Sequence, residues 1–137
     1  MEYRIGVTKV EADKISPLIL RLKSARQQVF TILTGEGLGR KAFFDAVRSV
    51  LPLDPPVMGS RSWDALSDSL WEGILNLHGK RTVIWWPDAE EFKERSRSDY
   101  NIALEVLQDV ALSLADPIKT NGKPKRVSIF VASSKSE

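Results

Sequence analysis

The sequence contains no cysteine and only one histidine among its 137 residues. Without cysteine, disulfides and thiolate chemistry are excluded, and a reducing compartment suits the chain better than an oxidising one. The first fourteen residues hold no apolar segment like that of a signal peptide, and no apolar run approaches the length of a membrane span. We therefore expect a cytoplasmic protein with no membrane partner.

The usual sequence marks of catalysis are also missing. His78 lies in a polar LHGK turn, and no serine or cysteine motif accompanies it. The glycines of TGEGLGRK lack the Gly-Lys-Ser/Thr ending that a phosphate-binding loop requires. We predict that the chain is not an enzyme, has no catalytic residue and needs no cofactor.

The length and composition predict one domain. A chain of 137 residues that is 42% hydrophobic can bury one core, and we expect residues 1–137 to form a single unit. Twenty basic and eighteen acidic residues give a net charge of +2, which neither demands nor excludes a nucleic acid partner.

Apolar strand-like runs alternate with amphipathic helices along the chain. We expect a short strand at 2–7, a helix at 16–26 capped by Ser16 with Pro17 in its first turn, and a buried strand within 27–35. A helix follows at 40–51, and then a loop stiffened by three prolines.

The second half continues the alternation. Strand-like runs at 81–86 and 127–132 enclose a helix that starts at Asp88, with Glu91 completing a capping box, and a long helix over 98–116. This order predicts an α/β fold with a small, mainly parallel sheet of three, possibly four, strands packed with helices.

Residues 62–77 form the least ordinary segment. As a helix, it places Trp63, Leu66, Leu70, Ile74 and Leu77 on one face. Asp64, Asp68 and Glu72 stand at i, i+4 and i+8, where like charges destabilise a helix. From residue 49 to 79 the only basic residue is Arg61, against four acids, so this segment carries −3 in a protein of net charge +2. The acids therefore have no local partners.

This acidic face has three explanations: a merely solvated face, an acidic docking surface for a basic partner, or a metal site. A metal site is disfavoured, because three carboxylates on one helix fan out along its axis and no second element visibly converges on them. We therefore predict no metal.

A second class of function is nucleic acid binding by a basic turn. Its cations share the turn with asparagine, glycine and proline, so a solvated loop is favoured, and neither a stacking platform nor a helix-turn-helix accompanies them. A nucleic acid partner is therefore not expected. The cations are Lys119, Lys123, Lys125 and Arg126.

The segment from Gly59 through DALSDSL at 64–70 resembles the barstar family of intracellular ribonuclease inhibitors, whose pattern is a glycine, a few residues, and then Asp-Ala-Leu-x-Asp-x-Leu. The order of elements from about 27 to 132 is similar too. The resemblance implies a barstar-like fold and an inhibitory surface made of this helix and the loop before it. By position, Asp64 and Asp68 would enter the nuclease active site, Asp68 in place of a substrate phosphate.

The sequence departs from that family in three respects. Ser67 stands where the best known member has tryptophan. Neither Asp109 nor Asp116 fits well as the family's further acidic contact on the long helix. Residues 1–26 have no counterpart and are expected to form an extension packed on or near the domain.

We therefore predict a barstar-like immunity or antitoxin protein that blocks the active site of a basic nuclease toxin. Carboxylates on a rigid helix make charge-assisted hydrogen bonds to the cationic groups of such a site and speed the encounter with it. The expected partner-binding residues are Asp54, Gly59, Arg61, Asp64, Ser67, Asp68, Trp71 and Glu72.

Overall fold

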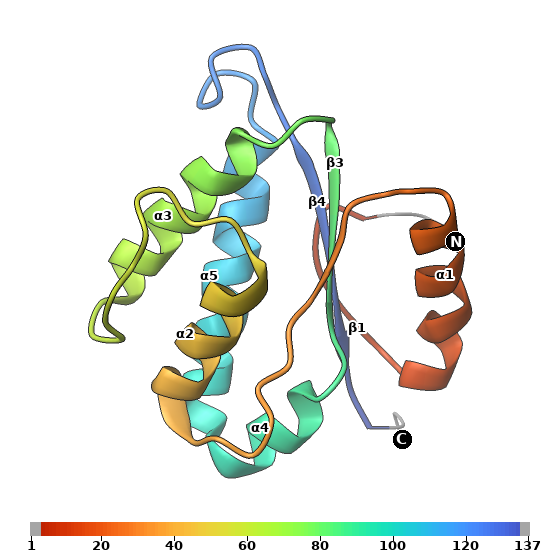
Figure 1. Ribbon diagram of the computed structural model, residues 1–137, viewed down its shortest axis with the longest axis vertical. Coiled ribbons are helices and arrows are strands. Elements are labelled where there is room, and N and C mark those ends of the chain that lie inside the picture. Colours follow the sequence, from red (N-terminus) through yellow and green to blue (C-terminus); the bar gives the residue numbers. More distant parts are fainter. Residues whose placement is uncertain (1–3, 135–137) are drawn as a thin grey trace.

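The computed structural model describes residues 4–134, in which helices alternate with parallel strands (Figure 1). One or two helices lie between each strand and the next, as the apolar periodicity predicted. The elements are β1 (Gly6–Val10), α1 (Ala12–Ser24), β2 (Val29–Thr31), α2 (Gly39–Val50), α3 (Trp63–Leu75), β3 (Arg81–Trp86), α4 (Ala89–Arg95), α5 (Arg97–Leu114) and β4 (Arg126–Ala132).

The four strands form one parallel sheet in the order β1-β4-β3-β2. The expected α/β fold with a small parallel sheet is thereby confirmed, and β1 is its fourth strand. Because every pair is parallel, all four strands begin at the same edge of the sheet, so the segments that precede them meet there.

The sheet separates two apolar clusters. Helix α1 lies on one side, while α2, α3 and α5 lie on the other (Figure 1). Alternation along β3 turns Trp86 into the larger cluster, where its ring lies 5.1 Å from that of Phe43, and Trp85 into the smaller cluster beneath α1. Both tryptophans are buried.

The boundaries near the amino end differ from the prediction. The strand expected at 2–7 occupies Gly6–Val10, and residues 1–3 lie outside the described part. The helix begins at Ala12, so Ser16 and Pro17 lie inside it, and the Ser16 hydroxyl donates to the carbonyl of Ala12 at 2.8 Å. Because proline has no N–H, one carbonyl in the preceding turn of the helix lacks its hydrogen-bond partner. Ser16 and Pro17 are both exposed, so water can reach that carbonyl.

The capping box expected at Asp88 is wrong. The Asp88 carboxylate makes no cap bond to α4 and instead accepts hydrogen bonds from the Thr34 and Gly35 amides, the Thr34 hydroxyl and the Trp86 indole at 2.8–3.1 Å. These bonds join the segment after β2 to the end of β3. The carboxylate that could have capped α4 is therefore used for tertiary contacts. Within residues 4–134, none of the helices is both long enough and apolar enough to cross a bilayer.

Candidate protein-docking site

Helix α3 is built with one buried and one exposed side. The Ser62 hydroxyl caps it by accepting from the Ala65 amide at 3.0 Å. Leu66, Leu70 and Ile74 are buried against the core. Trp63 and Leu77, expected in the same buried stripe, are only half-buried because they lie at or beyond the ends of the helix. The Trp63 ring packs on Phe44, with 5.0 Å between ring centroids.

The acidic side chains of α3 have no partner in the described part of the chain. Asp64 and Asp68 are exposed, and Glu72 is half-buried. The three ion pairs found within residues 4–134 join Glu11 to Lys14 and Asp45 to Lys41 and Arg48, so none involves α3. Among the described residues, no basic side chain from a distant part of the fold lies within 4.0 Å of these carboxylates.

The loop over residues 52–62 lies directly on α3. A Cβ at Gly73 would be 2.1 Å from the Pro52 carbonyl oxygen, so only glycine lets the two backbones approach this closely. Ser69, which is 1% exposed, donates its hydroxyl to the Pro55 carbonyl, and its own carbonyl accepts from the Asp54 amide at 3.0 Å. Helix and loop therefore form one surface.

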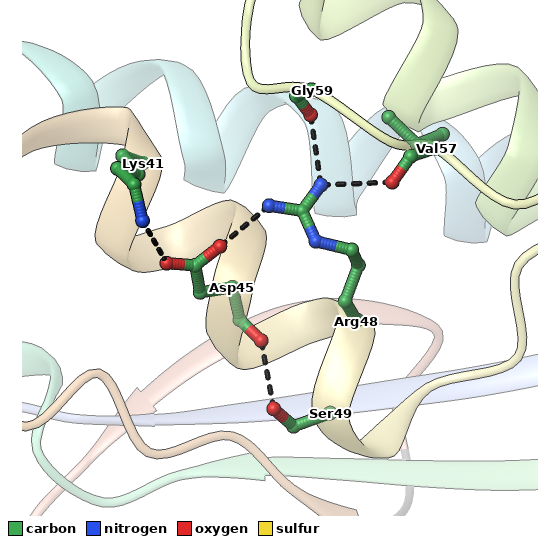
Figure 2. A network of polar contacts seen from close by, with 6 residues as sticks. All are labelled: Lys41, Asp45, Arg48, Ser49, Val57 and Gly59. Atoms are coloured by element: carbon green, nitrogen blue, oxygen red, sulfur yellow. Dashed lines mark hydrogen bonds and ion pairs between the residues drawn. The ribbon is translucent and has the colours of Figure 1, made fainter.

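A guanidinium from α2 holds the far end of this loop (Figure 2). Arg48 donates to the carbonyls of Val57 and Gly59, both at 2.8 Å, and to Asp45 at 2.5 Å. Asp45 also accepts from Lys41 at 2.7 Å. The hydrogen bond from Lys41, followed by the one from Arg48, lowers the pKa of the Asp45 carboxyl below its ordinary value. The motif glycine thus contributes its carbonyl to loop anchoring.

Asp68 lies between two grooves. The first runs between the loop and α3 and is mainly apolar; Met58 on its rim is 88% exposed. It is lined by Pro55, Pro56, Val57, Met58, Gly59, Arg61, Ser62, Ala65, Asp68 and Ser69. The second runs between α3 and α5 and is lined by Ser67, Asp68, Trp71, Asp109, Val110, Leu112, Ser113 and Lys119. A bound group at Asp68 therefore has walls on both sides.

The structure brings together only some of the residues that the sequence singled out. Gly59 and Arg61 line the first groove with Asp68, and Ser67 and Trp71 line the second. The Trp71 indole N–H donates to Ser113 on α5 at 3.0 Å, so its polar end is already satisfied within the chain.

The other predicted residues lie apart from these grooves. The Asp54 carboxylate is exposed and accepts a hydrogen bond from Asn76 at 3.2 Å. Asp64 and Glu72 line neither groove. They add to the negative charge of the helix, whereas Asp68 is the acid of α3 that lines both grooves.

Asp109, which fits poorly as the family's further acidic contact, lines the second groove together with Asp68. Its neighbours Leu107 and Val110 are buried, a pattern that leaves Asp109 on the exposed side of α5. The sequence alone does not show that this side faces α3. Lys119 also lines the groove but forms no ion pair with either acid.

The chain is a small α/β protein with an exposed acidic helix and a loop tethered to it. The family model described as Barstar (barnase inhibitor) matches residues 27–130, and the chain belongs to that family. Comparisons with curated proteins and with solved structures found no match. Members of the barstar family act as ribonuclease inhibitors, not as enzymes. The match begins after α1, so β1 and α1 lie outside it.

Proposed function

We propose that this protein is an immunity or antitoxin protein that blocks the active site of a basic nuclease toxin in the cytoplasm. The observation that carries the proposal is the exposed, unpaired Asp68 carboxylate at the junction of the two grooves. Family membership supports inhibition of a ribonuclease in general, and the identity of the nuclease is a matter for experiment.

The chemistry of the target explains why an inhibitor needs such a surface. A ribonuclease binds a phosphodiester and stabilises its transition state with arginine, lysine and histidine. Asp68 offers those groups a carboxylate in place of a phosphate, and charge-assisted hydrogen bonds, bidentate with arginine, hold it there. Asp109 supplies a second carboxylate from α5 across the groove. Water is excluded by the loop on one side and by Trp71 on the other.

The acidic field also acts before contact. Asp64 and Glu72 extend the negative charge along α3, and this charge attracts a basic cleft at a distance. Repulsion among the acids within the free protein is relieved when the partner's cations arrive. The cost to the isolated helix is of the order of a few tenths of a kcal/mol per pair.

The decisive test is Asp68→Ala with Glu94→Ala as the matched control, since Glu94 is an exposed acid on α4 that lines neither groove. The protein encoded by the neighbouring gene is co-expressed with the chain, and any RNA cleavage by it is measured against inhibitor concentration. Asp68→Ala should weaken inhibition by more than about 2 kcal/mol, roughly thirty-fold, with the urea midpoint unchanged or slightly raised.

Glu94→Ala should inhibit like the unaltered protein. Equal inhibition by Asp68→Ala and by the unaltered chain would remove Asp68 from the mechanism. Failure of the two proteins to co-purify would exclude that nuclease as the partner.

A further inference from the structure

A second charged feature lies at the edge of the sheet where the strands begin. A hollow there is lined by Arg26, Gln27, Gln28, His78, Gly79, Lys80, Arg81 and Arg126. These residues come from three separate segments, which immediately precede or open β2, β3 and β4. Since parallel strands start at one edge, the fold gathers four cations from three segments that are far apart in sequence.

Among residues 4–134, no acid lines this hollow. Arg81 and Arg126 occupy paired register positions on β3 and β4, so their side chains project from the same face of the sheet. Within residues 4–134, no carboxylate lies at ion-pair distance from Arg26, Lys80 or Arg126. This concentration of positive charge is the counterpart of the acidic concentration on α3.

The backbone at Arg26 places this residue at the wall of the hollow. Arg26 has φ 61° and directly follows the C-cap of α1, where the Gln27 amide donates to the Leu22 carbonyl at 2.9 Å. A left-handed residue at this position ends many helices. The conformation turns the chain from the end of α1 into β2 beside the other cations.

The helix dipole does not explain these cations. Arg21 and Lys23 lie in the last turn of α1, where basic residues offset the negative end of the helix. Arg26, Lys80 and Arg126 lie outside every helix, and each is exposed. They therefore have no such local role.

The basic turn considered from the sequence contributes little to this surface. Lys125 is buried, and its ammonium donates to the carbonyls of Leu77 and Gly79. Burial lowers the pKa of Lys125. Of the four cations in that turn, only Arg126 lines the hollow. The other cations of the hollow come from distant parts of the sequence.

The geometry points to a site for the phosphodiester backbone of a single-stranded nucleic acid at this edge. A protein partner requires apolar surface to bury, and no apolar side chain of residues 4–134 lines the hollow. Phosphates require only cations and N–H donors, which arginine presents as a planar fork. Among the described lining residues the imidazole of His78 is the one ring on which a base can stack, so the site binds mainly backbone and reads no sequence. It shares no residue with the two grooves at Asp68 and does not depend on the proposed inhibition.

The test uses the full chain without any nuclease. Fluorescence anisotropy with 12-nucleotide RNA and DNA strands of mixed sequence at 50 mM salt should give a Kd of about 1–100 µM. The logarithm of affinity should fall with the logarithm of salt with a slope of about −2 to −3, as expected for three or four phosphate contacts on a single strand. RNA binding with little DNA binding would identify the 2′-hydroxyl as part of the recognised chemistry.

Two triple variants distinguish binding at this hollow from a general effect of the protein's net charge. Arg26→Gln/Lys80→Gln/Arg126→Gln should weaken binding at least ten-fold and flatten the salt slope. Lys9→Gln/Arg40→Gln/Arg97→Gln removes the same charge from exposed positions outside the hollow and should change Kd less than three-fold.

Three results would overturn the inference. They are no binding of either strand at 50 mM salt, equal losses in the two triple variants, and equal binding of a polyglutamate of matched charge. The last would reveal a site for acidic protein segments. Inhibition of the nuclease by the first triple variant is measured separately, so failure of this site leaves the proposed function standing, and failure at Asp68 leaves this site standing.

Discussion

Individual small residues in α3 decide how the docking surface is assembled. The apolar periodicity correctly placed Leu66, Leu70 and Ile74 inside. It gave no reason for Gly73 and Ser69 to be buried, because a helical projection counts apolar side chains and cannot show which backbone crosses the helix. Both are buried beneath the loop, where a larger residue would separate the loop from α3.

Gly73→Ala is expected to destabilise the protein by about 1–3 kcal/mol. Alanine favours a helix over glycine by about 1 kcal/mol, but the new methyl group would lie 2.1 Å from a backbone oxygen that cannot move without displacing the loop. Gly59→Ala is the matched control, because nothing lies within 4 Å of its Cβ position. Urea unfolding checks both, and equal midpoints for the two variants would show that the loop does not rest on Gly73.

At the scale of elements, the loop depends on α2 as much as on α3. Sequence order placed helix, proline-rich loop and acidic helix in succession, and their existence and type were predicted correctly. The hydrogen bonds that tie α2 to the loop were not predicted, because the sequence does not show that Arg48 reaches the carbonyls of Val57 and Gly59. An arginine on an amphipathic helix ordinarily indicates a solvated face.

The anchoring of α2 to the loop should weaken in acid. The pKa of Asp45 in the folded protein is held below its ordinary value of 3.8 by Lys41 and then by Arg48. The stability from this carboxylate is therefore fully present above about pH 4 and is lost as the pH falls through the lowered pKa. Because the Asp45 side chain is 47% exposed, we expect less than about 1 kcal/mol.

Urea midpoints of the unaltered chain and of Asp45→Asn, compared at pH 7 and at a series of lower pH values, measure this contribution. The variant should be the less stable at pH 7, and the difference should shrink as the pH falls below the ordinary pKa of the carboxyl. A difference that does not change with pH would mean that the carboxylate charge is not what holds Arg48.

For the molecule as a whole, the sequence predicted the order of elements but not which distant segments meet. Alternating runs and the DALSDSL motif were enough for the class, the parallel sheet and the acidic helix. The position of Asp109 beside Asp68 and the convergence of Arg26, Lys80 and Arg126 arise from strand order and helix packing, which periodicity does not contain. The extension is a further example, since its strand pairs with β4 at the opposite end of the chain.

The extension covers a sheet face that would otherwise be exposed. Ile15, Leu18, Ile19 and Leu22 of α1 pack on an apolar patch of the sheet; the patch comprises Val83, Trp85, Phe130 and Ala132. Burying each aliphatic side chain stabilises by about 1.5–3 kcal/mol, so four of them rival a typical total stability of about 5–15 kcal/mol. The matched region at 27–130 is therefore not expected to be stable without α1.

Deleting residues 1–26 should abolish cooperative unfolding or leave a protein that binds a hydrophobic dye and aggregates, because the patch then faces water. Ile19→Ala, at 5% exposure, should cost about 2–5 kcal/mol in the intact chain, whereas Leu20→Ala, at 67% exposure on the same helix, should cost less than about 0.5 kcal/mol. Size-exclusion chromatography and urea unfolding distinguish these outcomes. A truncated chain that stays monomeric and unfolds at the original midpoint would show that the sheet face is stable without α1, and the extension would then need a role other than covering it.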